Sequence, residues 1–311
     1  MAMGELLVDF IATDGATSLQ AAQTFVARSG GAPANVTVAL ARLGVPSAFC
    51  GVAGADPFGD RLRAELAAEG VDASRLRQTP ETATTLAYAW KDARGDGHFW
   101  LLRGADTLLS PTDADAAGID RLAALVVGSV SLAAQPTGSA IERAVALANA
   151  AHVPVVFDIN FRPAVWRDPN EAVSPCLEVA GHSALVKLSL DDARGLFGPL
   201  VTPQAALERI LGLGPGAVVL TDGERGCWFV TRSDAQAVFV PAFAVDAVEP
   251  TGAGDAFLAA LIARSLASGW ATLSRDDVRY AAAAGALATT KPGAWDGLPD
   301  RHGLDVFLDH R

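Results

Sequence analysis

The chain has 311 residues, of which 50% are hydrophobic and 19% are charged. This composition supplies enough apolar material for one large α/β domain and excludes a disordered or fibrous chain. With 24 basic and 35 acidic residues the formal net charge is -11. We therefore expect no nucleic acid and no anionic membrane as a partner, because both are bound through a basic surface.

Short apolar runs alternate with Ala- and Leu-rich segments of helical period along the whole chain. The runs are apolar throughout and comprise residues 7–11, 47–52, 125–128, 153–158, 184–188 and 217–221. Such strands are typically buried on both faces, as in a parallel sheet covered by helices. The pattern predicts a three-layer, doubly wound, mostly parallel α/β fold. The uncharged segment 122–141 is interrupted by polar residues at 135–139, which favours a strand, a turn and a helix start over a membrane span.

The first glycine motif is Gly30-Gly31, which precedes a predicted helix over residues 36–43 that ends at Gly44. Paired glycines allow a ligand to approach the backbone, and the Asn35 amide can both donate to and accept from hydroxyl groups. Taken alone, this segment favours a loop that simply leads into a helix.

Residues 84–90 and 98–103 flank a polar, glycine-containing connection over residues 91–97, which indicates an antiparallel excursion from the main sheet. Its aromatic residues Trp90, Phe99 and Trp100 would suit a lid or a subunit contact. An ordinary edge hairpin is the alternative.

Asp158, Asn160 and Arg162 follow the predicted strand over residues 153–158. Ligands of open α/β sheets bind at the carboxyl ends of strands, so these side chains are well placed for binding. The Arg162 guanidinium could hold a phosphate or a carboxylate, and a salt bridge to Asp158 is the alternative.

Residues 221–226 connect two predicted strands and contain Thr221, Gly223 and Gly226. A tight turn accounts for the glycines without any ligand. A nucleotide contact through Thr221 and Gly223 is the second interpretation.

The most informative segment is Gly252-Ala253-Gly254-Asp255, which opens a strongly apolar helix. Glycines at a helix start bring free N–H groups and the helix dipole towards an anion, so the segment predicts a phosphate site. Asp255 could accept a proton from an attacking hydroxyl, and an ordinary Asp is ionised at neutral pH without a raised pKa. An Asp that only caps the helix is the alternative.

Other familiar sites are absent from the sequence. None of the three lysines, Lys91, Lys187 and Lys291, follows a P-loop glycine run, and the five histidines show no metal-binding spacing. The three cysteines are far apart in the chain, and we expect buried thiols in a reducing cytoplasm.

Taken together and in this order, these motifs resemble the ribokinase-like family of carbohydrate kinases over nearly the whole chain. Residues 30–35 and 40–44 resemble its N-terminal signature, residues 249–257 resemble its C-terminal signature, and residues 51–59 and 69–71 fit between them. Residues 4–11, 128–132 and 158–166 look most like fructokinase. The last of these segments is also similar to 2-keto-3-deoxygluconate kinase.

The resemblance implies an ATP-dependent sugar kinase that phosphorylates a primary hydroxyl, with Mg²⁺ and a monovalent cation such as K⁺ as further cofactors. It implies a single domain over residues 1–311, with a β lid formed approximately by residues 12–30 and 82–107 that mediates a homodimer. Fructose is the expected substrate. The alternatives are 2-keto-3-deoxygluconate, another sugar or nucleoside substrate, and a sugar sensor without catalysis.

Carried over position by position, the resemblance assigns four groups of residues. Catalysis falls to Asp255 as the base, to Gly252, Ala253 and Gly254 as the anion hole, and to Arg162. The sugar side comprises Asp9, Gly30, Gly31, Asn35, Arg103, Asn160, Arg162 and Asp255. The nucleotide side comprises Lys187, Ser189, Thr221, Gly223, Gly226, Gly252, Gly254 and Ala282. Metal positions are Asp192 for Mg²⁺ through water, and Glu249 and Thr251 for the monovalent cation.

Several positions depart from the family pattern. Glu249 stands where Asp is usual, Asp192 where Glu is usual, and Ala282 where Asn is common. The segment from Arg103 to Asp106 is shorter than in fructokinases.

Overall fold

The computed structural model describes residues 1–94 and 97–310, and its centre is a nine-stranded sheet. In order across the sheet, its strands are β13 (Asp234–Pro241), β12 (Gly226–Thr231), β11 (Ala217–Thr221), β10 (Leu185–Ser189), β9 (Val155–Asp158), β8 (Leu125–Gly128), β1 (Ala2–Met3), β4 (Ala48–Gly54) and β5 (Asp72–Thr79). The strands from β11 to β5 are parallel, and β12 and β13 extend one edge in antiparallel fashion.

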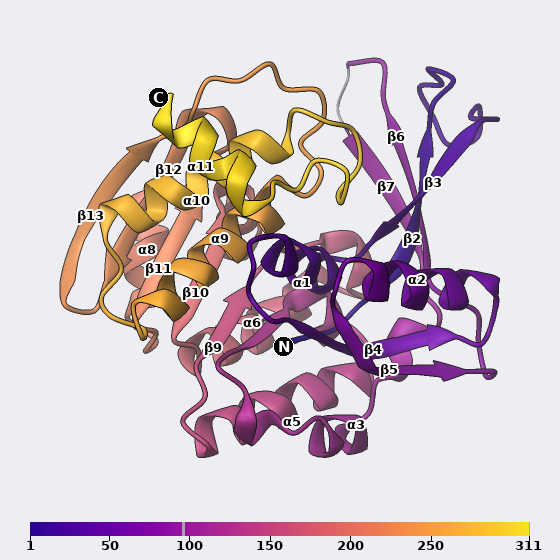
Figure 1. The fold of residues 1–311 in the computed structure, drawn as a ribbon, viewed down its shortest axis with the longest axis horizontal. Coiled ribbons are helices and arrows are strands. Elements are labelled where there is room, and N and C mark those ends of the chain that lie inside the picture. Colours follow the sequence, from indigo (N-terminus) through magenta and orange to yellow (C-terminus); the bar gives the residue numbers. More distant parts are fainter. Residues whose placement is uncertain (95–96, 311) are drawn as a thin grey trace.

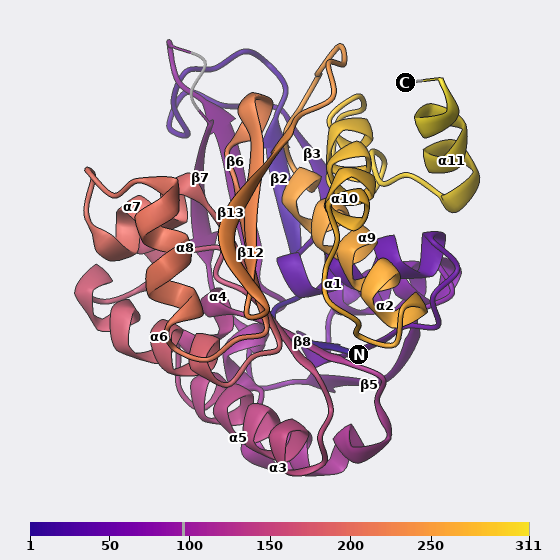
Figure 2. The same ribbon diagram turned by 90° about the vertical axis from the view of Figure 1, so that its left-hand side faces the viewer.

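Helices cover both faces of this sheet, so the predicted three-layer fold is confirmed (Figure 2). One apolar core lies under α1 (Ala32–Arg42), α2 (Pro57–Ala68), α9 (Ala253–Ala267), α10 (Arg275–Ala288) and α11 (Arg301–Asp309). The other lies under α3 (Pro111–Ala116), α4 (Ser129–Leu132), α5 (Thr137–Ala150), α6 (Val173–Gly181), α7 (Leu190–Phe197) and α8 (Pro203–Leu211). Successive residues of a strand serve opposite cores, as Phe49 and Cys50 do in β4. This double burial explains why the runs are apolar throughout.

A second sheet of four strands stands beside the main one at the upper right of Figure 1. Its order is β3 (Phe25–Gly30), β2 (Leu7–Ala12), β6 (Leu86–Lys91) and β7 (Gly97–Leu102). The prediction that residues 7–11 belong to the main sheet is wrong, because the main sheet takes only Ala2 and Met3 from this part of the chain. From Asp9 onward β2 is only partly buried, as suits a sheet with one open face.

The antiparallel excursion predicted around residues 84–103 is present as β6 and β7, which pair from Leu86 with Leu102 to Lys91 with Gly97. Within the predicted connection, Gly95 and Asp96 lie outside the described residues. The ring of Phe10 stacks on Tyr88 within the second sheet and meets Phe58 of α2 edge-on, which joins the second sheet to the helix layer.

Several local predictions hold. Helix α1 begins earlier than expected, at Ala32, and ends as predicted before Gly44, which has a positive φ of 78°. The uncharged segment 122–141 contains strand β8, helix α4 and the start of α5, and no helix among the described residues is long and apolar enough to cross a membrane. All three cysteines are buried and unpaired.

Candidate active site

Helix α9 begins with a backbone turn that only glycine adopts easily. Gly252, the residue before the helix, has φ 82°, in the left-handed region. The Ala253 N–H donates to the Pro250 carbonyl at 3.1 Å, so it turns inward. The described structure provides no protein acceptor for the N–H groups of Gly254 and Asp255. Of the predicted anion hole, the Ala253 N–H is therefore occupied, whereas the Gly254 N–H, together with that of Asp255 after it, remains available for a ligand.

Asp255, in the first turn of α9, is buried and hydrogen-bonded to the side-chain amide of Asn35 in α1. Nδ2 of Asn35 donates to Oδ2 of Asp255 at 2.7 Å. Burial raises the pKa of Asp255 above its ordinary value, and the Asn35 hydrogen bond and the charges of Lys187 and Arg162 oppose that rise. The sequence argument considered an ordinary Asp, whereas enclosure of the side chain moves the pKa of Asp255 upward.

A cation lies directly beside this helix start. A Cβ added at Gly254 would be only 2.8 Å from Nζ of Lys187, so the glycine lets β10 approach α9 closely. Nζ also lies 3.1 Å from both carboxylate oxygens of Asp158, its register neighbour on β9. Burial raises the pKa of Asp158 to about 6 despite this ion pair, which forms in place of the alternative salt bridge between Asp158 and Arg162.

Arg162 reaches the second sheet. Its guanidinium lies over the Phe99 ring of β7 at 5.8 Å, and its charge acts on Asp255. Asn160 precedes it with an unusual φ of 33°, and its carbonyl accepts a hydrogen bond from Ser129. The segment after β9 thus directs a cation that has no ion pair among the described residues towards the base and the second sheet.

Asp9 lies against the glycine pair and within electrostatic range of Asp255. A Cβ at Gly30 would be 2.1 Å from Oδ2 of Asp9, so this carboxylate occupies the space that a side chain would fill. Burial, followed by the charges of Glu249 and Asp255, raises the pKa of Asp9 to about 7. Gly31 precedes α1 and packs against the Glu5 carbonyl. These positions agree with a binding role next to the base.

Glu249 and Thr251 form a closed local arrangement. Oγ1 of Thr251 donates to Glu249 at 2.5 Å, and the Gly293 N–H donates to its other oxygen at 2.9 Å. Among the described residues there is no cluster of three His, Cys, Asp or Glu side chains suited to a metal ion. Any cation here would share oxygen atoms that already accept hydrogen bonds.

Asp192 and Ser189 form the amino-terminal cap of α7. The Ser189 hydroxyl accepts from the Asp192 N–H, and the Asp192 carboxylate accepts from the Ser189 N–H at 2.7 Å and from the Phe161 N–H at 2.8 Å. The buried carboxylate therefore ties the segment after β9 to α7. With one backbone donor on each oxygen, contact with Mg²⁺ through a water fits better than direct ligation.

The four remaining predicted nucleotide residues lie at three further places. Thr221 ends β11, and its hydroxyl faces the Leu188 carbonyl of β10. Gly223 lies in the turn between β11 and β12, as predicted, and Gly226 begins β12 and packs against the Val240 carbonyl. Ala282 is buried in α10 as part of the apolar core.

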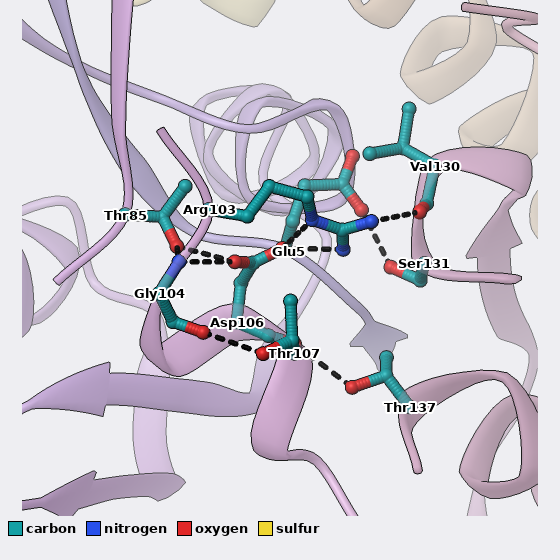
Figure 3. A network of polar contacts seen from close by, with 9 residues as sticks. All are labelled: Glu5, Thr85, Arg103, Gly104, Asp106, Thr107, Val130, Ser131 and Thr137. Carbon is teal, nitrogen blue, oxygen red and sulfur yellow. Dashed lines mark hydrogen bonds and ion pairs between the residues drawn. The ribbon is translucent and has the colours of Figure 1, made fainter. Parts of the chain in front are cut away.

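Arg103 lies in a buried polar network at the base of the second sheet (Figure 3). Its guanidinium donates twice to Asp106, at 2.5 and 2.9 Å, and once to the Val130 carbonyl at 3.1 Å. Thr85 donates to the other carboxylate oxygen of Asp106. These partners accept hydrogen bonds from the guanidinium N–H groups of Arg103, which indicates a structural role for this residue. The resemblance implied a contact with the sugar instead.

The same network reaches the connection between the two sheets. The buried Glu5 carboxylate accepts from the Ser131 hydroxyl at 2.6 Å. Burial raises the pKa of Glu5, and the Ser131 hydrogen bond and the charge of Arg103 oppose that rise. Together these contacts join β7, α4 and the chain between β1 and β2.

One residue of the site was not found by sequence reasoning. Nε1 of Trp295 donates to Oδ1 of Asn35 at 2.7 Å, behind the contact between Asn35 and Asp255. Its segment, residues 291–295, follows α10 and carries no motif that we recognised. The glycine and tryptophan that follow α10 are the one available signal, and they are too general to interpret.

The fold and site define the class of a phosphoryl-transfer protein: a doubly wound sheet, a helix amino end with free amides, and a carboxylate and a cation beside it. The model of the pfkB family of carbohydrate kinases matches residues 1–301, and the chain belongs to this family. It is therefore a phosphotransferase that acts on a sugar hydroxyl.

Three known proteins illustrate the relationship. The chain is 34% identical to fructokinase-1 of Oryza sativa subsp. japonica over 305 residues, with 96% of this chain and 94% of the relative covered. A fructokinase from Xylella fastidiosa, solved with bound ATP, aligns with a TM-score of 0.88 at 27% identity and covers 100% and 98% of the two chains. A double mutant of fructokinase from Vibrio cholerae O395, solved with fructose, ADP and potassium, aligns with a TM-score of 0.84 at 31% identity over 98% and 96%.

Proposed function

We propose that this protein is an ATP-dependent fructokinase that phosphorylates a primary hydroxyl of fructose. The observation that carries the proposal is the buried Asp255 in the first turn of α9, next to the free N–H of Gly254 and the Lys187 ammonium. The curated relatives and the solved neighbours named above as fructokinases support the choice of sugar.

In this proposal Asp255 accepts the proton of the sugar hydroxyl as that oxygen attacks. The N–H groups of Gly254 and Asp255, the dipole of α9 and the Lys187 charge stabilise the negative charge on the transferring group. Arg162 supplies a further positive charge from the open side. Asp9 and Asn35 orient the sugar, and general base catalysis contributes about 10²- to 10⁴-fold to the rate.

ATP and Mg²⁺ fit the residues that are present. A glycine-lined helix start and a buried lysine suit a phosphate chain, and Asp192 suits Mg²⁺ through a water. When bound, they supply the phosphoryl group and neutralise its charge. Thr221, Gly223, Gly226 and Ala282 lie on the proposed nucleotide side. We further propose that K⁺ binds near the oxygen atoms of Glu249 and Thr251. These atoms would contact the ion and also keep the hydrogen bonds described above.

The test is a panel of sugars with Mg-ATP in a coupled assay of ADP release, run with KCl and with tetramethylammonium chloride. We expect fructose to have the highest kcat/KM and the rate to be higher with K⁺. Preference for 2-keto-3-deoxygluconate would replace fructose with the competing substrate. Sugar binding without ADP release would identify a non-catalytic sensor.

Asp9→Asn is expected to weaken sugar binding while stabilising the protein. The KM for fructose should rise roughly tenfold to a hundredfold, because a hydrogen bond to a charged group contributes about 1.5–3 kcal/mol. The wild-type carboxyl has a pKa of about 7 in the folded protein against an ordinary value of 3.8, so its ionisation increasingly opposes folding between these pH values. The variant should therefore gain Tm relative to wild type as pH rises through this window.

The measurements are fructose kinetics at pH 8 and thermal unfolding at pH 4 and pH 8. The stability gain should be complete at pH 8 and nearly absent at pH 4. An equal difference in Tm at both pH values, or an unchanged KM, would contradict the assigned role of Asp9.

We propose that the second sheet acts as a lid over the sugar and as a homodimer interface, which is supported by the exposed side chains of Phe99, Trp100 and Leu102 on β7. We also propose a cytoplasmic location, which is supported by the three buried, unpaired cysteines.

A further inference from the structure

A chain of two hydrogen bonds leads from Trp295 to the base. Nε1 of Trp295 donates to Oδ1 of Asn35, and Nδ2 of Asn35 donates to Oδ2 of Asp255, both at 2.7 Å. The three side chains are buried, with exposed fractions of 8%, 5% and 9% in that order. Water therefore competes little for these contacts.

The indole determines which way the Asn35 amide faces. An indole N–H can only donate, so the oxygen of the amide must face Trp295. Its NH₂ group then faces Asp255, where it donates to the carboxylate. In the flipped orientation the amide oxygen would face the carboxylate, placing two acceptors together, and the NH₂ group would face the indole N–H, placing two donors together.

The main chain of Trp295 is held independently of its side chain. The Arg42 guanidinium donates to the carbonyls of Trp295 and Leu298 at 2.6 and 3.0 Å. Gly252, which precedes α9, packs against the backbone of Ala294. Loss of the indole N–H should therefore leave the path of this segment intact.

We propose that Trp295 is a positioning residue for catalysis: its indole N–H fixes the Asn35 amide in the orientation that holds and stabilises the ionised Asp255. This inference rests on the proposed kinase function and adds a residue that contacts neither sugar nor nucleotide. Through Asn35 it gives the base a support from the segment that follows α10.

The charges around Asp255 explain why the hydrogen bond from Asn35 is important for its ionisation. Lys187 on β10 and Arg162 after β9 favour the ionised carboxylate, whereas the neighbouring carboxylates Asp158 and Asp9 are of like charge. Burial opposes ionisation, and the Asn35 donor is one of the few groups that counter it. Without the fixed donor, protonated Asp255 becomes more frequent and the base is lost at higher pH than in wild type.

The test is Trp295→Phe, which keeps an aromatic ring and removes the N–H. We expect kcat at saturating fructose and Mg-ATP to fall about tenfold to a hundredfold, as small displacements of reacting groups typically do. The KM for ATP should stay within about twofold, because the nucleotide residues are untouched. The acid limb of the kcat–pH profile should move to higher pH, a change that a merely structural role would not produce.

Trp270→Phe is the matched control. Nε1 of Trp270 is buried and has no hydrogen-bond partner in the part of the chain that the structure describes. This substitution makes the same replacement of indole by phenyl at a partly buried position without affecting Asn35. We expect an unchanged kcat–pH profile. An equal shift in both variants would overturn the proposal.

A double-mutant cycle tests the route through Asn35. In an Asn35→Ala background, Trp295→Phe should have no further effect on kcat or its pH profile, because the amide that it orients is gone. Full additivity of the two substitutions would contradict the proposal.

A measurement on protein with its indole intact covers the case in which Trp295→Phe does not fold. The six tryptophans give a simple ¹⁵N-indole spectrum. One protected resonance should respond to Asn35→Ala and should shift with pH in the range of the acid limb of kcat. Absence of any such resonance would refute the hydrogen-bond chain. Failure of the kinase proposal is distinguishable, since wild-type protein would then release no ADP with any sugar.

Discussion

Asp255→Asn is expected to lower kcat by about 10²- to 10⁴-fold, the usual contribution of a general base, while Mg-ATP still binds. The replacement keeps the size of the side chain and the first turn of α9, so the free amides and Lys187 stay in place. What disappears is the group that accepts the hydroxyl proton. The measurements are steady-state kinetics with fructose and calorimetric titration with Mg-ATP.

Loss of folding cannot account for this result. Burial raises the pKa of Asp255, so its ionisation opposes folding as pH rises through the folded-state value. The uncharged Asn is free of that penalty, and we expect the Tm of the variant at pH 8 to equal or exceed that of wild type. A variant with near-normal kcat would show that another group accepts the proton.

Lys187→Met is expected to impair both stability and turnover. The substitution leaves Asp158 buried without its partner, and breaking a buried ion pair from one side costs about 3–5 kcal/mol. It also removes the cation next to Gly254, which should lower kcat/KM for ATP by about 10²-fold or more, the range found for loss of one electrostatic contact to a transition state. Denaturant unfolding and ATP kinetics measure the two effects.

A double variant separates these two effects. Lys187→Met with Asp158→Asn removes the unpaired charge, so it should recover most of the lost free energy of unfolding without recovering kcat/KM. The single variant should also be less destabilised at pH 5, because the pKa of Asp158 is already raised to about 6 and rises further without the lysine. If the double variant regained turnover, Lys187 would serve the fold alone.

The fold could be predicted well because its signals are local. Strands apolar throughout indicate a covered parallel sheet, and glycines before an apolar helix indicate the start of α9. The placement of residues 7–11 could not be predicted, since an apolar run does not tell which of two sheets it joins. Only pairing with Phe25–Gly30 and Leu86–Lys91 decides this.

The residues at the centre of the site could be predicted from the sequence, whereas the residues that hold them in position could not. Asp255 and Gly254 lie in one short motif, whereas the Lys187–Asp158 pair depends on the register of two neighbouring strands. Arg103 carries a side chain suited to binding an anionic or polar ligand. However, Asp106, three residues further along the chain, holds it in a buried ion pair. Trp295 and Asn35 are 260 positions apart, and no spacing rule relates them.

The connectivity of the second sheet has a consequence for the order of folding. Its central pair joins residues 8–11 to residues 86–89 in parallel, with α1, β4, α2 and β5 between them. Closing so long a loop loses chain entropy before any contact compensates for it, so pairings between distant segments form slowly. The main sheet beside β4 and β5 must bring these ends together first. The second sheet should therefore complete its central pairing only after β4 and β5 have joined the main sheet and brought the ends of this long loop together.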